Sequence, residues 1–335
     1  MSGQAFVTGG SGFLGQALLR RLAEDGWRTR ALARSPRAAE AVTALGARAV
    51  TGDLADGAAL AAGAAGCDVA FHLAALTAPW APPEAYRAVN VEGTAAVLAA
   101  CRAAGVGRLV HASTEAVLMA GEDLHEVDET APLRPDSAVP YCATKAVAEQ
   151  LVAEAGGPGA GGPGAGGSDL ETVVVRPRMV WGPGDTTIVP NLRAAIEAGR
   201  FAWIGGGSQR TDATHVDNAV EGLVLAATRG RPGGTYFVTD GQRASFRSFA
   251  TELLDAHGLT PPPRSLPLPV ARAGAAACEA VWRALGLRRA PPLTRIAVWL
   301  AGLEATIDIT RATTELGYRP VTGRAEGLAA LARTS

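Results

Sequence analysis

The sequence contains no run of apolar residues as long as the roughly 18–20 that a helix needs to span a bilayer. Its most apolar late segments, 268–287 and 295–303, are interrupted by the charged residues Arg272, Glu279, Arg283 and Arg295. We therefore expect no transmembrane segment. Two interpretations of these segments stay open, namely peripheral contact with a membrane surface and the lining of a substrate pocket.

Cysteine and histidine are scarce. The four cysteines form no C-x-x-C pair and have no metal-ligand spacing, which favours reduced thiols and a cytoplasmic protein. The five histidines also lack metal-ligand spacing, so no metal site is predicted. The first strand is expected to begin at Gln4, which leaves no room for a signal peptide.

An excess of charge of one sign is also missing. Lys and Arg number 31 against 32 Asp and Glu, which makes the formal net charge −1. This balance gives no sign of a nucleic-acid partner or of electrostatic attachment to a membrane. With 335 residues, of which 48% are hydrophobic, the chain is long enough for a large core and has the composition of a globular protein.

What the sequence does have is a regular alternation of short apolar runs and helical segments. Strands are expected at 4–8, 29–33, 47–51, 68–74, 107–113 and 172–177, and helices near 13–25, 36–45 and 84–104. Strands that alternate with helices indicate right-handed βαβ units, and uniformly apolar strands indicate burial on both faces. The sequence therefore predicts an α/β fold with a doubly wound parallel sheet, that is, a Rossmann fold.

The alternation weakens after residue 180, which predicts two unequal domains. We expect a dinucleotide-binding domain over 1–180 and a smaller substrate-binding cap over most of 181–335, with part of 210–240 returning to the Rossmann core. The Gly/Pro repeat at 156–167 cannot bury a core and is predicted to be a flexible surface insertion without a catalytic part.

A glycine-rich turn follows the first predicted strand. The stretch "TGGSGFLG" carries Gly9, Gly12 and Gly15, with Phe13 and Leu14 opening an amphipathic helix. Glycines allow a tight turn and a close approach to a pyrophosphate, and the helix N-terminus offers unpaired N–H groups. Because the motif lies between a strand and a helix, as the motif requires, it predicts a dinucleotide site.

The end of the second strand discriminates between the nicotinamide cofactors. NAD sites usually carry an acid there, whereas NADP sites carry a cation near the 2′-phosphate. Here the sequence reads "RALARSPR", with Arg34 and no acid, so NADP(H) is predicted and NAD(H) is the alternative. An ordinary surface arginine remains an alternative for Arg34.

Two later strand ends complete the predicted cofactor site. Asp53 and Leu54 lie in "GDL", where Asp53 either accepts a bond from the adenine amino group or only forms a turn. Ala74 lies in "HLAA", where small side chains let the cofactor lie against the backbone.

The stretch "VPYCATKAVAEQ", 139–150, indicates a helix that carries Tyr141 and Lys145 on one face, one turn apart. Taken alone, packing and a solvated charge explain this pair. A tyrosine phenol has a reference pKa of about 10, and a neighbouring ammonium group lowers the pKa of such a phenol. The pair therefore also suits a general acid or base.

Eight stretches occur in an order that resembles one family. They are "TGGSGFLG", "GDL", "FHLAA", "NVEGTAAVLAAC", "GVGRLVHAST", "PYCATK", "VVRPRMVWGPGD" and "THVDNAVEGL". Together they resemble the extended short-chain dehydrogenase/reductases, which include the epimerases and dehydratases. The ending "DITRATTELGYRP" is similar to that of the 3β-hydroxysteroid dehydrogenase-like group. The resemblance covers the whole chain except the Gly/Pro repeat.

The resemblance implies a catalytic set of a hydroxyl residue, a tyrosine and a lysine. Tyr141 and Lys145 match its Y-x-x-x-K pattern, and Thr114 in "HAST" matches the hydroxyl position, with Ser113 as the alternative. Tyr141 would protonate a carbonyl oxygen, Thr114 would hydrogen-bond that oxygen, and Lys145 would hold the nicotinamide ribose and lower the pKa of Tyr141. Pro177 and Val180, after the sixth strand, would bracket the nicotinamide.

Three hypotheses on function follow. The first is an NADP(H)-dependent reductase of a mostly apolar ketone, such as a steroid, 3-oxo acid or aryl ketone, with late apolar residues such as Trp299 and Leu285 in the pocket or in the core. The second is a nucleotide-sugar epimerase or dehydratase with tightly bound NAD, which needs a diphosphate-binding arginine such as Arg210. The third is a non-catalytic NADP-sensing protein. The partner is a small carbonyl or alcohol substrate in the first case, and the resemblance implies a homodimer.

Overall fold

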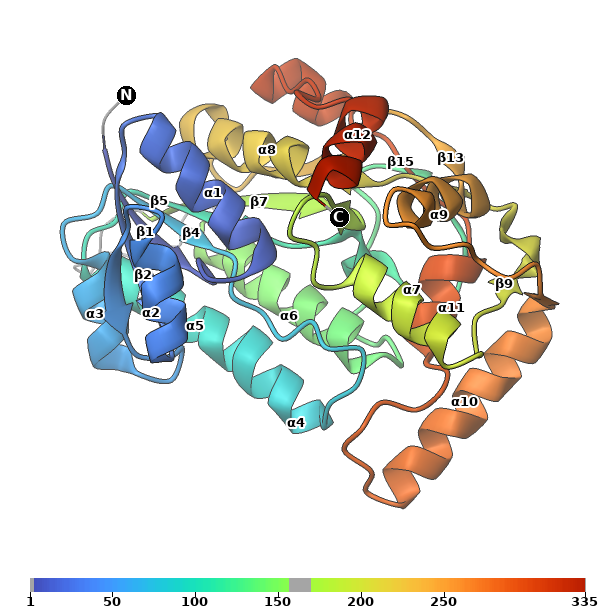
Figure 1. Ribbon diagram of the computed structural model, residues 1–335. Helices are drawn as coiled ribbons and strands as arrows, with labels where there is room; N and C mark the ends of the chain where they lie inside the picture. The colour runs from blue at the N-terminus through green and yellow to red at the C-terminus, as the bar shows by residue number, and fades with distance from the viewer. Residues whose placement is uncertain (1–2, 157–169, 335) are drawn as a thin grey trace.

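The structure, a computed structural model, describes residues 3–156 and 170–334. The predicted flexible insertion at 156–167 therefore lies outside the described residues, apart from Gly156. A seven-stranded sheet with the strand order β12-β7-β5-β4-β1-β2-β3 lies between two layers of helices (Figure 1), and every neighbouring pair in it is parallel. Its strands are β1 (Gln4–Thr8), β2 (Arg28–Ala33), β3 (Arg48–Thr51), β4 (Val69–His72), β5 (Arg108–Ala112), β7 (Glu171–Pro177) and β12 (Thr235–Val238). The predicted doubly wound fold is confirmed.

Helices cover both faces of this sheet. One face carries α1 (Phe13–Glu24), α2 (Pro36–Thr43) and α8 (Val216–Arg229), and the other carries α3 (Gly57–Ala64), α5 (Gly93–Ala103) and α6 (Pro140–Ala155). Successive strand residues belong to opposite clusters, as the two-residue period of a strand requires: Val7, Phe71, Val110 and Val175 face α1 and α8, whereas Phe6, Ala70, Leu109 and Val174 face the other helices. Both faces being apolar explains why the strands show no polar alternation.

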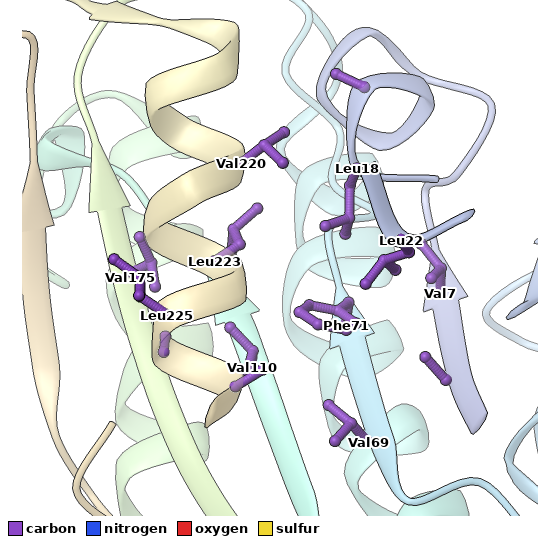
Figure 2. Close-up of a cluster of buried hydrophobic side chains, with 14 of the residues drawn as sticks. Val7, Leu18, Leu22, Val69, Phe71, Val110, Val175, Val220, Leu223 and Leu225 are labelled. Carbon is purple, nitrogen blue, oxygen red and sulfur yellow. The ribbon is translucent and has the colours of Figure 1, made fainter. Parts of the chain in front are cut away.

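Packing holds the first helix firmly against the sheet. Figure 2 shows Leu18 and Leu22 of α1 beside Val7 and Phe71, with side chains of α8 on the same face. Leu18, Leu19 and Leu22 are each 0% exposed. Burial of one such side chain contributes about 1.5–3 kcal/mol, so these contacts fix the start of α1 and with it the glycine turn.

The predicted helix at 84–104 is present but is not a regular α-helix throughout. It consists of α4 (Pro83–Tyr86), a π-helical turn η1 (Arg87–Glu92) and α5. Asn90 lies in the π turn with 1% exposure. Its side chain bonds both backbone groups of Leu76 and donates to Thr144 Oγ1, so it connects the loop after β4 to α6.

The remaining elements form a smaller layer beside the carboxyl ends of the strands (Figure 1). A second sheet has the order β13-β10-β15-β6, and two pairs, β8 with β11 and β9 with β14, stand apart. These strands are β6 (Leu124–Val127), β8 (Val180–Trp181), β9 (Trp203–Ile204), β10 (Arg210–Thr211), β11 (Thr214–His215), β13 (Ala244–Ser245), β14 (Ser265–Leu266) and β15 (Ala305–Ile307). The helices and turns are η2 (Glu115–Leu118), α7 (Ile188–Glu197), η3 (Gly205–Gly207), α9 (Phe246–Asp255), α10 (Leu268–Ala284), α11 (Arg295–Gly302), η4 (Ala312–Leu316) and α12 (Arg324–Thr334).

One late segment, 214–228, contains the end of a strand pair as well as a helix. Thr214 and His215 pair with β8 as a short strand, and α8 begins only at Val216. His215 has an extended backbone, and its ring accepts a hydrogen bond from Asp217 N, so it caps the helix instead of opening it. The division into two domains at residue 180 stays a prediction.

Candidate active site

The glycine turn has a backbone that only glycine accommodates at two positions. Gly9 has φ +76°, and a Cβ there would lie 2.6 Å from the backbone nitrogen of Ala74. A Cβ on Gly15 would lie 2.1 Å from the carbonyl oxygen of Gly9. Gly12 caps α1 without a side-chain hydrogen bond, and the first turn contains no acid. Apart from Gly12 N, which donates to Gly9 O, no side chain of the described residues competes with an anion for the N–H groups at the start of α1, and the turn fits the pyrophosphate of a dinucleotide. The first turn also contains Phe13 and Leu14, both half-buried.

The predicted cofactor residues at the ends of β2 and β3 lie beside this turn in the sheet order. Arg34 directly follows β2 and is exposed, with no acid between it and α2. Asp53 is exposed, and its Oδ1 accepts a hydrogen bond from Ala55 N, which is the turn-forming interaction. Leu54 packs against Gly93 at the start of α5. Ala74 contacts the glycine turn, and its N–H donates to Thr8 Oγ1.

Tyr141 and Lys145 both lie on α6, one turn apart. Pro140 occupies the first helical position, where its fixed φ suits the helix and forces Val139 into an extended conformation. Tyr141 therefore enters in the first turn, at the edge of the sheet where the strands end. Lys145 is 3% exposed. Its ammonium group donates to the carbonyl oxygen of Ala112 at 2.8 Å and lies 3.1 Å from His111 Nε2.

The two hydroxyl residues after β5 have different partners. Ser113 Oγ donates to Glu149 Oε2 at 2.5 Å, on the α6 side of the strand. Thr114 lies close enough to the Tyr141 hydroxyl to influence its pKa, and its Oγ1 donates to Glu115 Oε2 at 2.8 Å. The structure therefore brings Thr114, and not Ser113, to the phenol.

The pKa of Tyr141 differs from the sequence expectation. Burial raises it above the usual value of a phenol, the negative charge of Glu115 raises it further, and the hydrogen bond with Thr114 opposes the rise. Lys145 is not among the groups that lower it, so the expected effect of Lys145 on the phenol is not found in this structure. Tyr141 is consequently held in its protonated form, which is the form that a proton donor needs.

Lys145 itself is perturbed by its surroundings. Burial lowers the pKa of Lys145 to about 8, and the carboxylate of Glu149 opposes this decrease. That carboxylate also forms a buried ion pair with Arg176, and both side chains are 3% exposed. Glu149 lies one helical turn after Lys145 on the same face, but nothing in the sequence pattern distinguishes it from a surface acid.

Two buried histidines lie beneath the site on neighbouring strands. His72 and His111 are partners in the register of β4 and β5, with ring centroids 5.2 Å apart. His72 lies between Thr8 and Thr94, at 2.7 and 2.9 Å from their hydroxyls. Burial, together with the charge of Lys145, lowers the pKa of His72 to about 3 and that of His111 well below its usual value. Both rings are therefore neutral at neutral pH.

A second charged pair borders Thr114. Arg178 is 0% exposed, and its Nη1 lies 2.6 Å from Glu115 Oε1, while its Nε and Nη2 donate to Thr211 Oγ1. Pro177 ends β7 and Val180 begins β8, so both flank this arginine, and Met179 between them has φ +41°. The sequence analysis did not find the role of Glu115, although an acid adjacent to the predicted hydroxyl residue was visible in "HASTEAV".

Tyr141 is half-buried beside apolar side chains, some of which come from the cap. It packs against a buried cluster that includes Met119, Ala275 of α10 and Trp299 of α11. Trp299 therefore belongs to the core beside the site. Leu285 does not, because it is 66% exposed.

Arg210 lies apart from this group. It is exposed, and its Nη2 bonds Glu304 Oε1 at 3.0 Å across the second sheet. An exposed ion pair of this kind contributes little stability. His215 and Asp217 lie at the start of α8, where the His215 ring packs edge-on against Trp181 and Asp217 accepts a hydrogen bond from Thr322.

Both the sequence and the structure of this chain are similar to those of known proteins. Residues 6–270 match the model of the 3-beta hydroxysteroid dehydrogenase/isomerase family. A 4-hydroxy-2-methyl-3-oxo-4-farnesyl-3,4-dihydroquinoline-1-oxide ketoreductase of Stigmatella aurantiaca is 46% identical over 98% of this chain and 95% of its own length. A 2-alkyl-3-oxoalkanoate reductase of Stenotrophomonas maltophilia is 37% identical over 98% of each chain. The solved structure of MoeE5 in complex with UDP-glucose and NAD has a TM-score of 0.72 and 26% identity, covering 99% of this chain and 98% of that one.

Proposed function

The chain belongs to the 3-beta hydroxysteroid dehydrogenase/isomerase family, within the extended short-chain dehydrogenase/reductases, and from this premise we propose that it reduces the ketone of a mostly apolar substrate with NADPH. It is an oxidoreductase of that family. The observation that carries the proposal is the position of Tyr141. Its hydroxyl meets Thr114 at the carboxyl edge of the sheet, while its ring belongs to an apolar cluster that continues into α10 and α11.

The side chains of the site suit proton transfer to a carbonyl oxygen. Tyr141, whose pKa is raised, keeps its proton until a strong acceptor forms, and it donates that proton as the oxygen gains negative charge. Thr114 donates a second hydrogen bond to the same oxygen once its hydroxyl turns from Glu115 toward the substrate. A bound nicotinamide cofactor supplies the hydride for the carbonyl carbon.

Lys145 is proposed to hold the cofactor ribose. Its ammonium group is oriented by two acceptors, His111 Nε2 and the carbonyl of Ala112, and its third N–H is left for a hydroxyl on the cofactor side. The glycine turn would bind the pyrophosphate, with Gly9, Gly12 and Gly15 allowing the close approach.

NADP(H) is preferred over NAD(H) in this proposal because Arg34 follows β2 and no acid does. An exposed guanidinium at this position suits a 2′-phosphate, which it can bind through two parallel hydrogen bonds. MoeE5, by comparison, is a protein solved with NAD. The preference for NADP(H) can be tested by cofactor binding alone, without turnover of a substrate.

The substrate is proposed to carry its ketone next to a bulky apolar group, as a steroid, a 3-oxo acid or an aryl ketone does. Two relatives bear the names of reductases for a farnesyl-substituted and an alkyl-substituted oxo compound. The apolar residues around Tyr141 support such a substrate because their burial of an apolar group is favourable.

The test is a reductase assay with purified protein, in which NADPH and NADH are compared across steroids, 2-alkyl-3-oxo acids, aryl ketones and flavonoids. Oxidation of NADPH that depends on one of these ketones is the expected result. Turnover of none of them, together with tight binding of a sugar nucleotide and release of NAD on denaturation, would establish the epimerase or dehydratase alternative instead. Binding of NADPH without turnover of any substrate would favour the NADP-sensing alternative.

The proposal includes two properties of the whole protein. A homodimer would form through α5 and α6, which lie side by side on one face of the sheet (Figure 1), and light scattering in solution tests it. A cytoplasmic location fits the cysteines, all four of which are free thiols. Within residues 3–156 and 170–334, no helix is both long and apolar enough to cross a membrane.

A further inference from the structure

Exposed apolar side chains are concentrated on one helix of the cap. Of the five large exposed hydrophobic residues in the described part of the chain, four lie on α10 or the turn that follows it: Val270, Val281, Leu285 and Leu287, with exposures of 56%, 48%, 66% and 39%. The fifth, Val321, lies before α12. Scattered exposed apolar residues are normal, but four on one element form a surface that is set apart from the rest.

These residues continue as a stripe along the helix. Exposed alanines fill the positions between them at intervals of three or four residues, which places them all on one side of α10. We call this stripe the α10 outer face, and it consists of Val270, Ala273, Ala277, Val281, Ala284, Leu285 and Leu287. The opposite side of the helix, with Ala271 and Ala275, is buried in the cluster around Tyr141.

The end of the stripe is held in a defined conformation. Gly286 has φ +62°, and Leu287 N donates to the carbonyl of Trp282, which closes α10 with a left-handed glycine. Trp80, in the loop after β4, donates to the carbonyl of Leu287, and the guanidinium of Arg283 lies over its ring. The two exposed leucines are therefore presented by an anchored turn.

The part of the chain that carries this stripe has charges that are almost all positive. Between residues 256 and 303 the chain has six arginines and a single acid, Glu279. Glu279 is 4% exposed and pairs with Arg295, so it adds no negative charge to the surface. Arg288 and Arg289 are exposed and form no ion pair with a described residue. The net charge of −1 for the whole chain thus conceals a locally basic surface.

We propose that the α10 outer face docks the protein on an anionic phospholipid membrane surface. An exposed apolar stripe flanked by arginines is the composition of a helix that lies in the interface between lipid headgroups and acyl chains. The arginines would attract the anionic headgroups while the valines and leucines enter the acyl boundary. This inference does not depend on the proposed function.

Charge favours lipid over a second copy of the chain as the occupant. In a twofold contact the same surface of two copies meets, so Arg288 and Arg289 would approach the like charges of the other copy. No exposed acid between residues 256 and 303 is available to compensate them. A negatively charged surface carries the complementary charge.

Docking in this orientation would also bring the site close to the lipid. One side of α10 carries the outer face, and its other side belongs to the same apolar cluster as Tyr141. An apolar compound dissolved in the membrane would therefore face the layer of helices that covers the site. Figure 1 shows α10 at the edge of the cap, on the side away from α1 and the N-terminus.

The test is co-sedimentation of the full chain with vesicles at low ionic strength. The protein should bind vesicles of equimolar phosphatidylcholine and phosphatidylglycerol, and bind vesicles of phosphatidylcholine alone much more weakly. The double variant Arg288→Gln/Arg289→Gln should lower the partition coefficient on anionic vesicles about 25-fold, since each basic side chain at such a surface contributes roughly a factor of five. Val281→Ser/Leu285→Ser should lower it about tenfold or more through the lost apolar burial.

Matched controls are available in the same chain. Arg20→Gln/Arg48→Gln removes two exposed arginines from the opposite end of the molecule, and Val321→Ser removes the remaining large exposed hydrophobic residue. Both should bind vesicles as the unchanged protein does. Because all substituted side chains are exposed, unchanged thermal unfolding of each variant verifies its fold.

Three results would overturn the proposal. The first is no binding to either kind of vesicle, and the second is binding that the α10 substitutions leave unchanged. The third is a shift in molecular mass of the Val281→Ser/Leu285→Ser variant in light scattering without loss of vesicle binding, which would identify the α10 outer face as a contact between copies of the chain.

Discussion

The ammonium group of Lys145 lies 3.1 Å from Nε2 of His111, and both side chains are buried. An ammonium group can only donate, so Nε2 must accept, and the ring hydrogen of the neutral histidine is on Nδ1. The charge of Lys145 and burial together keep the pKa of His111 low, which preserves this arrangement. His111 is thus the group that orients the lysine from beneath.

The surroundings of Lys145 determine the pH above which activity is expected to fall. Because burial lowers the pKa of Lys145 to about 8, the lysine loses its charge as the pH rises through that value. We expect kcat/KM for ketone reduction to fall above about pH 8. In Lys145→Arg, which keeps its charge at all accessible pH values, activity is lower but the alkaline fall disappears. A fall at the same pH in this variant would assign the limit to another group.

Tyr141 is predicted to be the proton donor. Tyr141→Phe should reduce kcat about 10²- to 10⁴-fold, the usual contribution of general acid catalysis, with the dissociation constant of NADPH unchanged. Tyr86→Phe is the matched control, because Tyr86 is a buried tyrosine near Tyr141 whose hydroxyl donates to the carbonyl of Ala78. Full turnover in Tyr141→Phe would refute the assignment.

The two adjacent hydroxyl residues are predicted to have separate functions. Thr114→Val should lower kcat about 10- to 100-fold, because the hydrogen bond to the carbonyl oxygen is lost in the transition state. Ser113→Ala should leave kcat near the original value and lower the free energy of unfolding by about 1 kcal/mol, through loss of its bond to Glu149. Kinetics and urea unfolding of both variants check this, and the reverse pattern would exchange their assignments.

Arg34 is predicted to select the cofactor. Arg34→Ala should weaken NADPH binding about 10- to 100-fold, as expected for the loss of a charge-assisted hydrogen bond to a phosphate, and leave NADH binding unchanged. Fluorescence titration with both cofactors measures it. Arg48→Ala, another exposed arginine at a strand of the same sheet, is the control. An equal effect on NADPH and NADH would remove Arg34 from the 2′-phosphate site.

Because of His72, we expect the free energy of unfolding to decrease in mild acid. Its pKa is lowered to about 3 in the folded protein, so between that value and about 6.5 the unfolded chain binds a proton that the folded chain does not. The stability is therefore present above about pH 6.5 and is lost as the pH falls, by about 2 kcal/mol between about pH 7 and pH 5. Urea unfolding at the two pH values should show this loss reduced in His72→Gln and unchanged in His125→Gln, an exposed histidine. An equal loss in all three proteins would contradict it.

Several features were predictable because they are local in the sequence. The short apolar runs of the strands and the glycines of the turn depend on backbone geometry, which neighbouring residues determine. The spacing of Tyr141 and Lys145 is one helical turn, so their common face followed directly once 140–155 was assigned as a helix. The order of these patterns along the chain then indicated the family, to which the comparisons assign it.

The residues around the site could not be predicted from the sequence, because they come together through contacts between distant segments. His72 and His111 become neighbours only because β4 and β5 are adjacent in register, and Arg178 reaches Glu115 only through the position of the strand end after β7. Burial and the charge of Glu115 raise the pKa of Tyr141, where the isolated pair predicted a decrease. A pKa depends on burial and on every charge nearby, and neither quantity is encoded in spacing along one helix.

For the apolar segment 268–287, too, the sequence determined one property and the tertiary structure another. Its amino-acid sequence showed an apolar run too interrupted by charge to span a bilayer, and it left a pocket lining and a membrane-surface contact as equal alternatives. Packing against α11 and the cluster around Tyr141 buries Ala271 and Ala275 and leaves Val281 and Leu285 in solvent. Only tertiary structure decides this, because the side of a helix that becomes buried depends on which other elements pack against it.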